Sequence, residues 1–190
     1  DGVELYRTDL SSESGHDKLV EGVDHIIHAA AKTSDWGPYE EFYRINYLST
    51  LELLNAAKKA SVDNFIYLSS ISVHGFGPHR GSTEKGPYYP LQSSYQETKK
   101  MAEEAVIEST QDNFSTHVIR AGNVYGPDDT TTFYPIFDAM LDGKMSYVNK
   151  GRALTCPVFI DDLLQAIYKA FMSRETSGEA FNITSGEKVS

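Results

Sequence analysis

Short apolar runs alternate with longer amphipathic segments along this sequence, and that alternation constrains the fold more than any other feature. The apolar runs are four to seven residues long, contain many Ile, Val, Phe and Tyr residues, and end in polar or turn residues. Such runs are typical of strands that are buried in a sheet. The predicted strands are Val3–Tyr6, His25–Ala30, Asn64–Ser70, His117–Ala121 and Ala180–Ile183.

Three segments between these runs have helical periodicity. They extend from about Tyr39 to Ala60, from Ser94 to about Ser109, and from Asp161 or Asp162 to Met172. The first carries an i, i+3, i+4, i+7 stripe that starts at Thr50, and an aspartate can cap the start of the third. Strands that alternate with helices of this length form βαβ units, so we expect an α/β fold with a mainly parallel sheet.

Composition narrows the classes of partner. Seventeen basic residues against 27 acidic ones give the 190-residue chain a net charge of −10, which repels nucleic acid and anionic lipid. No apolar stretch approaches the ~20 residues that span a bilayer. The single cysteine, Cys156, can form no internal disulfide, which fits a reducing compartment. We therefore expect a cytoplasmic protein that binds a small molecule rather than nucleic acid or a membrane.

The stretch Gly75–Pro90 interrupts the alternation with four glycines and three prolines among sixteen residues. We expect a loop there, just after the strand that ends at Ser70. Ligands of open parallel sheets bind at the carboxyl ends of the strands, so this loop should lie over the site.

Tyr95 and Lys99 place a phenol and an ammonium four residues apart, on one face of a predicted helix. A neighbouring ammonium lowers the pKa of a phenol, and the pair can then exchange a proton with a hydroxyl or carbonyl group. Ser70, at the carboxyl end of a strand, can hydrogen-bond the same oxygen. The alternative interpretations are an ordinary exposed helical pair and a strand that simply ends in small polar residues.

Several ordered motifs resemble the extended short-chain dehydrogenase/reductase superfamily, often called the NAD-dependent epimerase/dehydratases. The resemblance runs over most of the chain. Besides Tyr95 and Lys99, the matching segments are Thr8–Leu10, His25–Ala31 with Thr33, Asn46, Leu68–Gly75, Arg120–Pro127, Val158–Leu163 and Gly178–Ile183.

The resemblance implies a Rossmann-like, doubly wound parallel sheet and a catalytic centre of Ser70, Tyr95 and Lys99. Tyr95 would be the acid/base, Lys99 would lower its pKa and hold the nicotinamide ribose, and Ser70 would orient the reacting oxygen. Asn123 would face the substrate. His74 is a second substrate candidate, although a partly buried loop histidine is the alternative. The implied cofactor-binding residues are Asp9, Leu10, Ala29, Ala30, Ala31, Thr33, Asn46, Ser69, Tyr95, Lys99 and Gly122.

The family's opening strand, glycine-rich turn and helix have no counterpart in this sequence. The stretch Gly75–Gly81 is misspaced for that turn and contains a proline. We therefore expect an N-terminally truncated domain: residues 1–125 as the remainder of the dinucleotide-binding domain, and 126–190 as a partial substrate-binding region interleaved with late Rossmann elements. The residue that separates NAD from NADP is also absent, so both cofactors stay possible.

Two positions discriminate among reactions. Ile71-Ser72 follows Ser70 where dehydratases of this family have an Asp-Glu pair, and Thr155 stands where nucleotide-sugar epimerases have an arginine, with Arg152 out of register. We therefore expect a secondary-alcohol dehydrogenase or ketone reductase. The alternatives are a nucleotide-sugar 4-epimerase with retained NAD and a non-catalytic dinucleotide sensor.

Three smaller expectations complete the sequence analysis. Tyr88, Tyr89, Phe133 and Tyr134 could contact an apolar substrate. No metal site is expected, because no His or Cys cluster accompanies Asp161 and Asp162. The Tyr39–Ala60 and Tyr95 helices could pair two copies into a homodimer.

Overall fold

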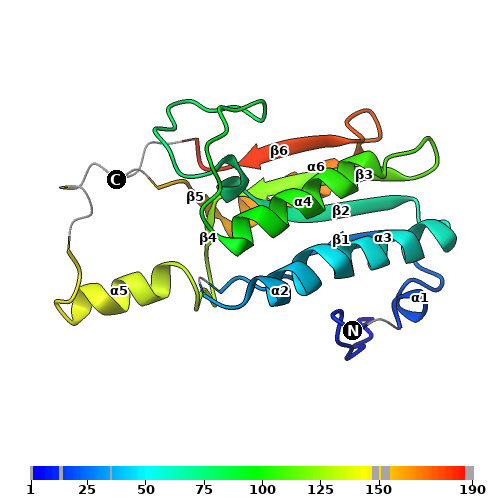
Figure 1. Cartoon of the computed structure of the whole chain (residues 1–190), viewed down its shortest axis with the longest axis horizontal. Helices are drawn as coiled ribbons and strands as arrows, with labels where there is room; N and C mark the ends of the chain where they lie inside the picture. Colours follow the sequence, from blue (N-terminus) through cyan, green and yellow to red (C-terminus); the bar gives the residue numbers. More distant parts are fainter. Residues whose placement is uncertain (1, 13–14, 35, 147–149, 151–154, 187–190) are drawn as a thin grey trace.

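The computed structural model describes residues 2–12, 15–34, 36–146, 150 and 155–186. Its main sheet has four parallel strands in the order β1-β2-β3-β6 (Figure 1). They are β1 (His25–His28), β2 (Asn64–Ser70), β3 (Ser115–Ala121) and β6 (Glu179–Ile183). Four of the five predicted strands are therefore confirmed, with ends that move by at most two residues, and the parallel α/β architecture is confirmed with them.

The fifth predicted strand, Val3–Tyr6, is wrong. Residues 2–9 have no regular secondary structure, and the side chain of Val3 is 90% exposed. An apolar run becomes a strand only where a neighbouring strand takes up its backbone hydrogen bonds. No described strand pairs with this segment, and β1 pairs only with β2 on its inner side.

One face of the sheet is covered by a long composite helix and by α4. The composite helix consists of α2 (Tyr39–Phe42), the π-helical segment η1 (Tyr43–Leu48) and α3 (Ser49–Lys59). It matches the predicted helix, although the π turn was not foreseen. The predicted stripe from Thr50 is buried as expected. α4 (Ser94–Glu108) begins at the N-cap Ser93, whose hydroxyl accepts the N–H of Gln96.

α6 (Ile160–Met172) covers the opposite face with Leu163 and Ile167, which pack against Ile66 and Ile119 (Figure 1). This helix starts before the predicted aspartate. Asp161 and Asp162 lie in its first turn and make no side-chain cap, so they favour the helix through its dipole alone.

The remaining elements were not predicted. A short 3₁₀ turn, η2 (Ile71–His74), follows β2, and α1 (His16–Leu19) packs on α3. β4 (Asn123–Tyr125) and β5 (Pro157–Phe159) form a separate parallel pair, and α5 (Phe133–Leu141) extends from the body of the molecule (Figure 1). β6 lies beside β3, so residues beyond 126 contribute to the main sheet as well as to α5 and β5 outside it.

Candidate functional site

The carboxyl ends of three neighbouring strands bring most of the predicted site residues to one edge of the sheet. Ala29 follows β1, Ser70 ends β2, and Gly122 follows β3; Ser70 lies in register with Ala121. This is the edge at which open α/β sheets bind ligands. The Gly75–Pro90 segment is a loop at the same edge, as expected, and it opens no helix.

Tyr95 lies in the first turn of α4, close enough to Ser70 for the Ser70 side chain to lower the pKa of the Tyr95 phenol, although burial raises that pKa by more. The lowering of the Tyr95 pKa by Lys99 stays a prediction. The Ser70 hydroxyl also accepts the N–H of Ser72, which fixes it at the start of η2.

Lys99 is 2% exposed and points beneath Tyr95 into the sheet. Its Nζ donates to the Leu68 carbonyl at 2.5 Å and lies 4.1 Å from the centre of the Tyr67 ring. Burial lowers the pKa of Lys99 to about 7, although the nearby Glu103 carboxylate raises it. Lys99 is thus a buried amine, and its burial favours the neutral form.

The Ser69 hydroxyl faces the interior rather than the ligand edge. It donates to Glu103 Oε2 at 2.9 Å, and the same carboxylate binds Arg120. Any contact of Ser69 with a cofactor would therefore go through its backbone. Sequence reasoning missed Glu103 and Arg120, although each is a charged residue inside an otherwise buried stretch, which is itself a signal.

Asn46 lies in η1 and contacts α4 through Thr98. Its Nδ2 donates to Thr98 Oγ1 at 3.2 Å, and its Oδ1 accepts the N–H of Lys32 at 2.7 Å. It thus joins α4 to the segment that follows Ala31, and it contacts Thr98 rather than Lys99. π segments of this kind recur at functional sites. Thr33 is exposed on the same segment.

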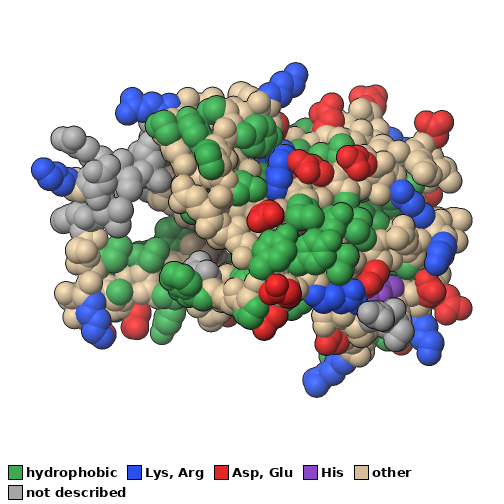
Figure 2. All heavy atoms as spheres, in the orientation of Figure 1, with side chains coloured by type: hydrophobic (Ala, Val, Ile, Leu, Met, Phe, Trp, Pro, Cys, Tyr) green, Lys and Arg blue, Asp and Glu red, His purple; other side chains and the backbone are tan. Residues whose placement is uncertain are grey.

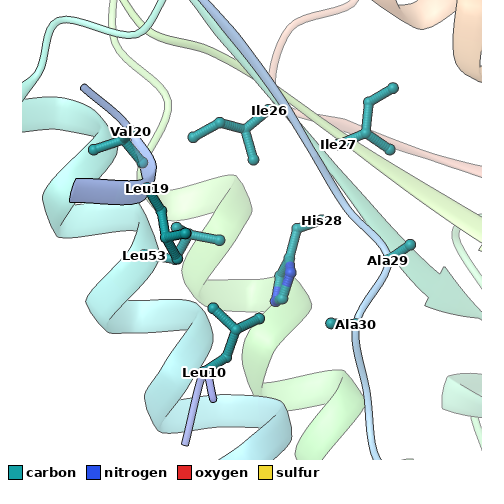
Figure 3. Close-up of a pocket in the computed structure, with 9 residues that line it drawn as sticks. All are labelled: Leu10, Leu19, Val20, Ile26, Ile27, His28, Ala29, Ala30 and Leu53. Atoms are coloured by element: carbon teal, nitrogen blue, oxygen red, sulfur yellow. The ribbon is translucent and has the colours of Figure 1, made fainter. Parts of the chain in front are cut away.

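Leu10, Ala29 and Ala30 line an apolar cavity of about 230 Å³ beside β1, together with Leu19, Val20, Ile26, Ile27, His28 and Leu53 (Figure 3). Asp9 is exposed next to this cavity. Its carboxylate accepts the N–H and the hydroxyl of Ser11, which hold the pKa of Asp9 below its usual value.

The two predicted substrate residues lie in different environments. Asn123 is exposed at the ligand edge and donates to Thr155 Oγ1 at 2.7 Å. His74 is buried, stacks on Tyr88 with ring centres 4.7 Å apart, and contacts Asn182 and Arg120. This favours the alternative of a buried loop histidine.

Gly122 is required sterically. A Cβ at this position would lie 2.2 Å from the Cys156 carbonyl oxygen, which no side chain tolerates. The lack of a side chain at Gly122 therefore allows the β4–β5 pair to pack closely against β3. Arg152, the arginine out of register, lies outside the described residues.

Two kinds of feature are not found in the described part of the chain. No group of three His, Cys, Asp or Glu side chains is arranged to hold a metal ion. No described helix is long and apolar enough to cross a membrane.

Comparison with known proteins assigns the family. The sequence model of the NAD dependent epimerase/dehydratase family matches residues 1–184, so the chain belongs to this family. It is 31% identical to human sterol-4-alpha-carboxylate 3-dehydrogenase, decarboxylating, over 98% of this chain and 52% of the relative. It is 29% identical to a 4-hydroxy-2-methyl-3-oxo-4-farnesyl-3,4-dihydroquinoline-1-oxide ketoreductase of Stigmatella aurantiaca, over 88% of this chain and 51% of that protein.

Solved structures give the same fold. A UDP-glucuronic acid 4-epimerase from Bacillus cereus, in complex with UDP-glucuronic acid and NAD, is 26% identical with a TM-score of 0.82. The match covers 96% of this chain and 60% of that one. The Rossmann-like fold is thereby confirmed, and the chain spans about half the length of the curated relatives it matches.

Proposed function

We propose that this chain carries the catalytic centre of an NAD(P)-dependent oxidoreductase that transfers hydride between the nicotinamide and a secondary alcohol or ketone. The observation that supports the proposal is the proximity of the Ser70 and Tyr95 side chains at the ligand edge of the sheet, with Lys99 one turn further along α4. A phenol and a hydroxyl that lie this close can both reach a single substrate oxygen.

In ketone reduction, the Tyr95 hydroxyl would give its proton to the carbonyl oxygen as that oxygen gains negative charge. Ser70 would donate a hydrogen bond to the same oxygen, and its bond with Ser72 N–H keeps it in place. Burial holds Tyr95 protonated in the ligand-free protein. In that state Tyr95 is a proton donor, which suits the direction of reduction.

The residues at the ligand edge fit a nicotinamide dinucleotide at its two ends. The apolar cavity between Leu10 and Ala30 suits a flat ring such as adenine. Lys99 Nζ donates to the Leu68 carbonyl, and we assign the nicotinamide ribose to Lys99 as part of this proposal. When bound, the nicotinamide supplies or accepts the hydride. We assign no residue of this chain to the diphosphate.

The test is hydride transfer, followed as NADH or NADPH consumption with a panel of ketones. Tyr95→Phe should lower the rate by about 10²–10⁴-fold, because it removes the proton donor and little else. Tyr168→Phe is the matched control, since Tyr168 is 64% exposed on α6, and it should leave the rate unchanged. Equal rates in the two variants would refute the assigned role of Tyr95.

The similarity to a UDP-glucuronic acid 4-epimerase supports a second candidate, a nucleotide-sugar 4-epimerase with retained NAD. Two contacts favour a substrate without a diphosphate. Asn123 binds the neutral Thr155 hydroxyl, and the Asp129 carboxylate accepts the amides of Thr131 and Thr132, which precede α5, and of Phe133, its first residue. That carboxylate already neutralises the helix end that would attract a phosphate. Epimerisation without net NADH formation would favour the second candidate. Dinucleotide binding without hydride transfer to any substrate would favour a non-catalytic sensor.

We also propose a homodimer that forms through the composite helix and α4. Tyr39, Tyr43 and Tyr47 form a ladder of rings along the composite helix, and the Tyr39 hydroxyl reaches Glu97 and Met101 on α4. Figure 2 shows hydrophobic side chains gathered over α3 and α4. A monomer by light scattering would refute the dimer. We further propose that the protein works in the cytoplasm, where its exposed Cys156 thiol would stay reduced.

A further inference from the structure

Glu103 and Arg120 form an ion pair in the interior of the molecule. Glu103 is 0% exposed and Arg120 is 3% exposed. The guanidinium donates from Nε to Oε2 at 2.9 Å and from NH2 to Oε1 at 2.5 Å, a two-pronged contact. Burying such a pair gains little stability over apolar residues of the same size. Its retention therefore calls for a reason other than stability.

Glu103 lies next to the proposed catalytic centre. Its Oε2 accepts the hydroxyl of Ser69, the residue next to Ser70, at 2.9 Å. It also lies four residues after Lys99 on α4, on the same buried face of the helix. One carboxylate thus touches the strand end that carries Ser70 and lies one helical turn from the Lys99 ammonium.

Arg120 extends the contact to the loop over the site. Its NH1 lies 3.2 Å from His74 Nε2 and donates to the Glu84 carbonyl at 3.0 Å. The Glu84 carboxylate accepts the N–H of Asn182 at 2.9 Å, which fastens the loop to β6. Both ends of the Ser70–Gly75 turn are therefore held by side chains that meet at Arg120.

We propose that Glu103, paired with Arg120, is a positioning residue of the Ser70–Tyr95–Lys99 centre: it holds the Ser70 strand end through Ser69 and places a carboxylate one helical turn from Lys99. This inference rests on the proposed function, because it concerns the same three residues. It adds a charged residue that touches neither substrate nor cofactor and acts through its neighbours.

The titratable and charged groups that act on Lys99 come from several elements. Glu103 is on α4, Tyr67 is on β2, His28 is on β1, and Arg120 reaches Glu103 from β3. Glu103 is the carboxylate among them. Its loss removes the negative charge and also leaves the Arg120 guanidinium unpaired, and both changes disfavour a second cation nearby.

The experiment is a pH titration of Lys99 by NMR on the full 190-residue chain with ¹³C-labelled lysine, with the Lys99 signal assigned through Lys99→Gln. We expect a midpoint near 7 in the native chain. Glu103→Gln should lower that midpoint by about one unit or more. Glu103→Asp, which keeps the charge, should remain closer to the native midpoint. An unchanged midpoint in Glu103→Gln would overturn the proposal, since a purely structural glutamate would alter stability alone.

If Glu103→Gln does not fold, the double variant Glu103→Gln/Arg120→Gln replaces both charges with neutral groups that can hydrogen-bond. Its Lys99 midpoint should still fall below the native one, because Glu103 shares the helix face with Lys99 and Arg120 does not. A native midpoint in the double variant would overturn the proposal.

The titration needs neither substrate nor cofactor, so its outcome is separate from that of the proposed function. Absence of hydride transfer from the native protein would refute the proposed function and leave the Lys99 titration to decide on Glu103. Where activity is present, Glu103→Gln should also shift the pH profile of kcat to lower pH, in parallel with the midpoint.

Discussion

The main sheet and α5 use apolar and charged residues in opposite ways. In the sheet region, β2, β3 and α4 bury Tyr67, Ile119 and Val106, and even their charges lie inside, as the Glu103–Arg120 pair does. No residue of α5 is buried, although Tyr134, Phe137, Met140 and Leu141 are apolar or aromatic. The ion pair beside α5, Asp142–Lys144, is fully at the surface.

The same residue types thus lie in the interior in the sheet region and at the surface on α5. In the sheet region, buried polar groups such as Glu103 and Arg120 are paired with one another and surrounded by apolar groups. On α5, a helix with mostly apolar side chains and little cover has the composition of a surface that contacts something else. Stability should therefore depend on the sheet region, with α5 contributing little to it.

The largest effect should come from breaking the buried ion pair. Arg120→Ala leaves the Glu103 carboxylate buried without its cation, and we expect a loss of about 3–5 kcal/mol in the free energy of unfolding. Lys144→Ala, which breaks the surface pair, should cost about 0–1 kcal/mol. Urea unfolding of both variants measures the contrast, and similar losses in the two would contradict it.

Leucine truncation compares the two regions through packing alone. Leu54 is 1% exposed in the core under α3, and Leu141 is 88% exposed at the end of α5. Leu54→Ala should cost about 2–5 kcal/mol, because it leaves a cavity. Leu141→Ala should stay within about 0.5 kcal/mol. A large loss for Leu141→Ala in thermal or urea unfolding would mean that α5 is part of the stable body.

Acid should weaken the sheet region through His28. Burial, with the Lys99 and His16 charges, lowers the pKa of His28 to about 4 from an ordinary 6.5. As the pH falls, the unfolded chain therefore takes up this proton before the folded protein does. The free energy of unfolding is undiminished by His28 above pH 6.5 and decreases as the pH drops towards 4. The loss is on the order of 3 kcal/mol.

The matched variant for this pH effect is His28→Gln, which can still hydrogen-bond Thr50 but cannot take up a proton in this range. Denaturant unfolding at several pH values should show a shallower decline in the variant. The same decline in both proteins would assign the acid sensitivity to other groups.

The smallest expected effect is a gain. Lys99→Met replaces a buried ammonium by an apolar chain of similar length, and we expect about 1–2 kcal/mol of added stability at or below pH 7 together with loss of hydride transfer. Because the folded pKa of Lys99 is about 7, the gain should shrink as the pH rises from 7 towards 10.5. A destabilised Lys99→Met would show that the Leu68 hydrogen bond outweighs the cost of burying the charge.

The strands and helices of the sheet region could be predicted because their sequence periods match their burial. Asn64–Ser70 is apolar almost throughout and is buried almost throughout, and Thr50 and Leu54 recur at the helical interval. β4 and β5 could not be predicted, since three residues carry no usable period. Val3–Tyr6 was predicted wrongly because its local pattern favours a strand and no neighbour completes one.

The positions of the candidate site residues could be predicted from the sequence in the same way. Tyr95 and Lys99 could be placed on one helical face by spacing, and Ser70 at a strand end by its position. Their ionisation could not be predicted, because the depth of Lys99 and the pKa of Tyr95 depend on what surrounds them. Glu103 and Arg120 are 17 residues apart and meet only when α4 packs on β3.

The sequence by itself determined the α/β class, the parallel sheet and the order of the motifs, because these follow from local periodicity and from spacing along the chain. Only the tertiary structure decided that His74 and the Ser69 hydroxyl face the interior, that burial lowers the pKa of Lys99, and that the Glu103 carboxylate binds both Ser69 and Arg120. The physical reason is that burial and long-range charge contacts are properties of packed surfaces, and no local pattern specifies which surfaces will meet.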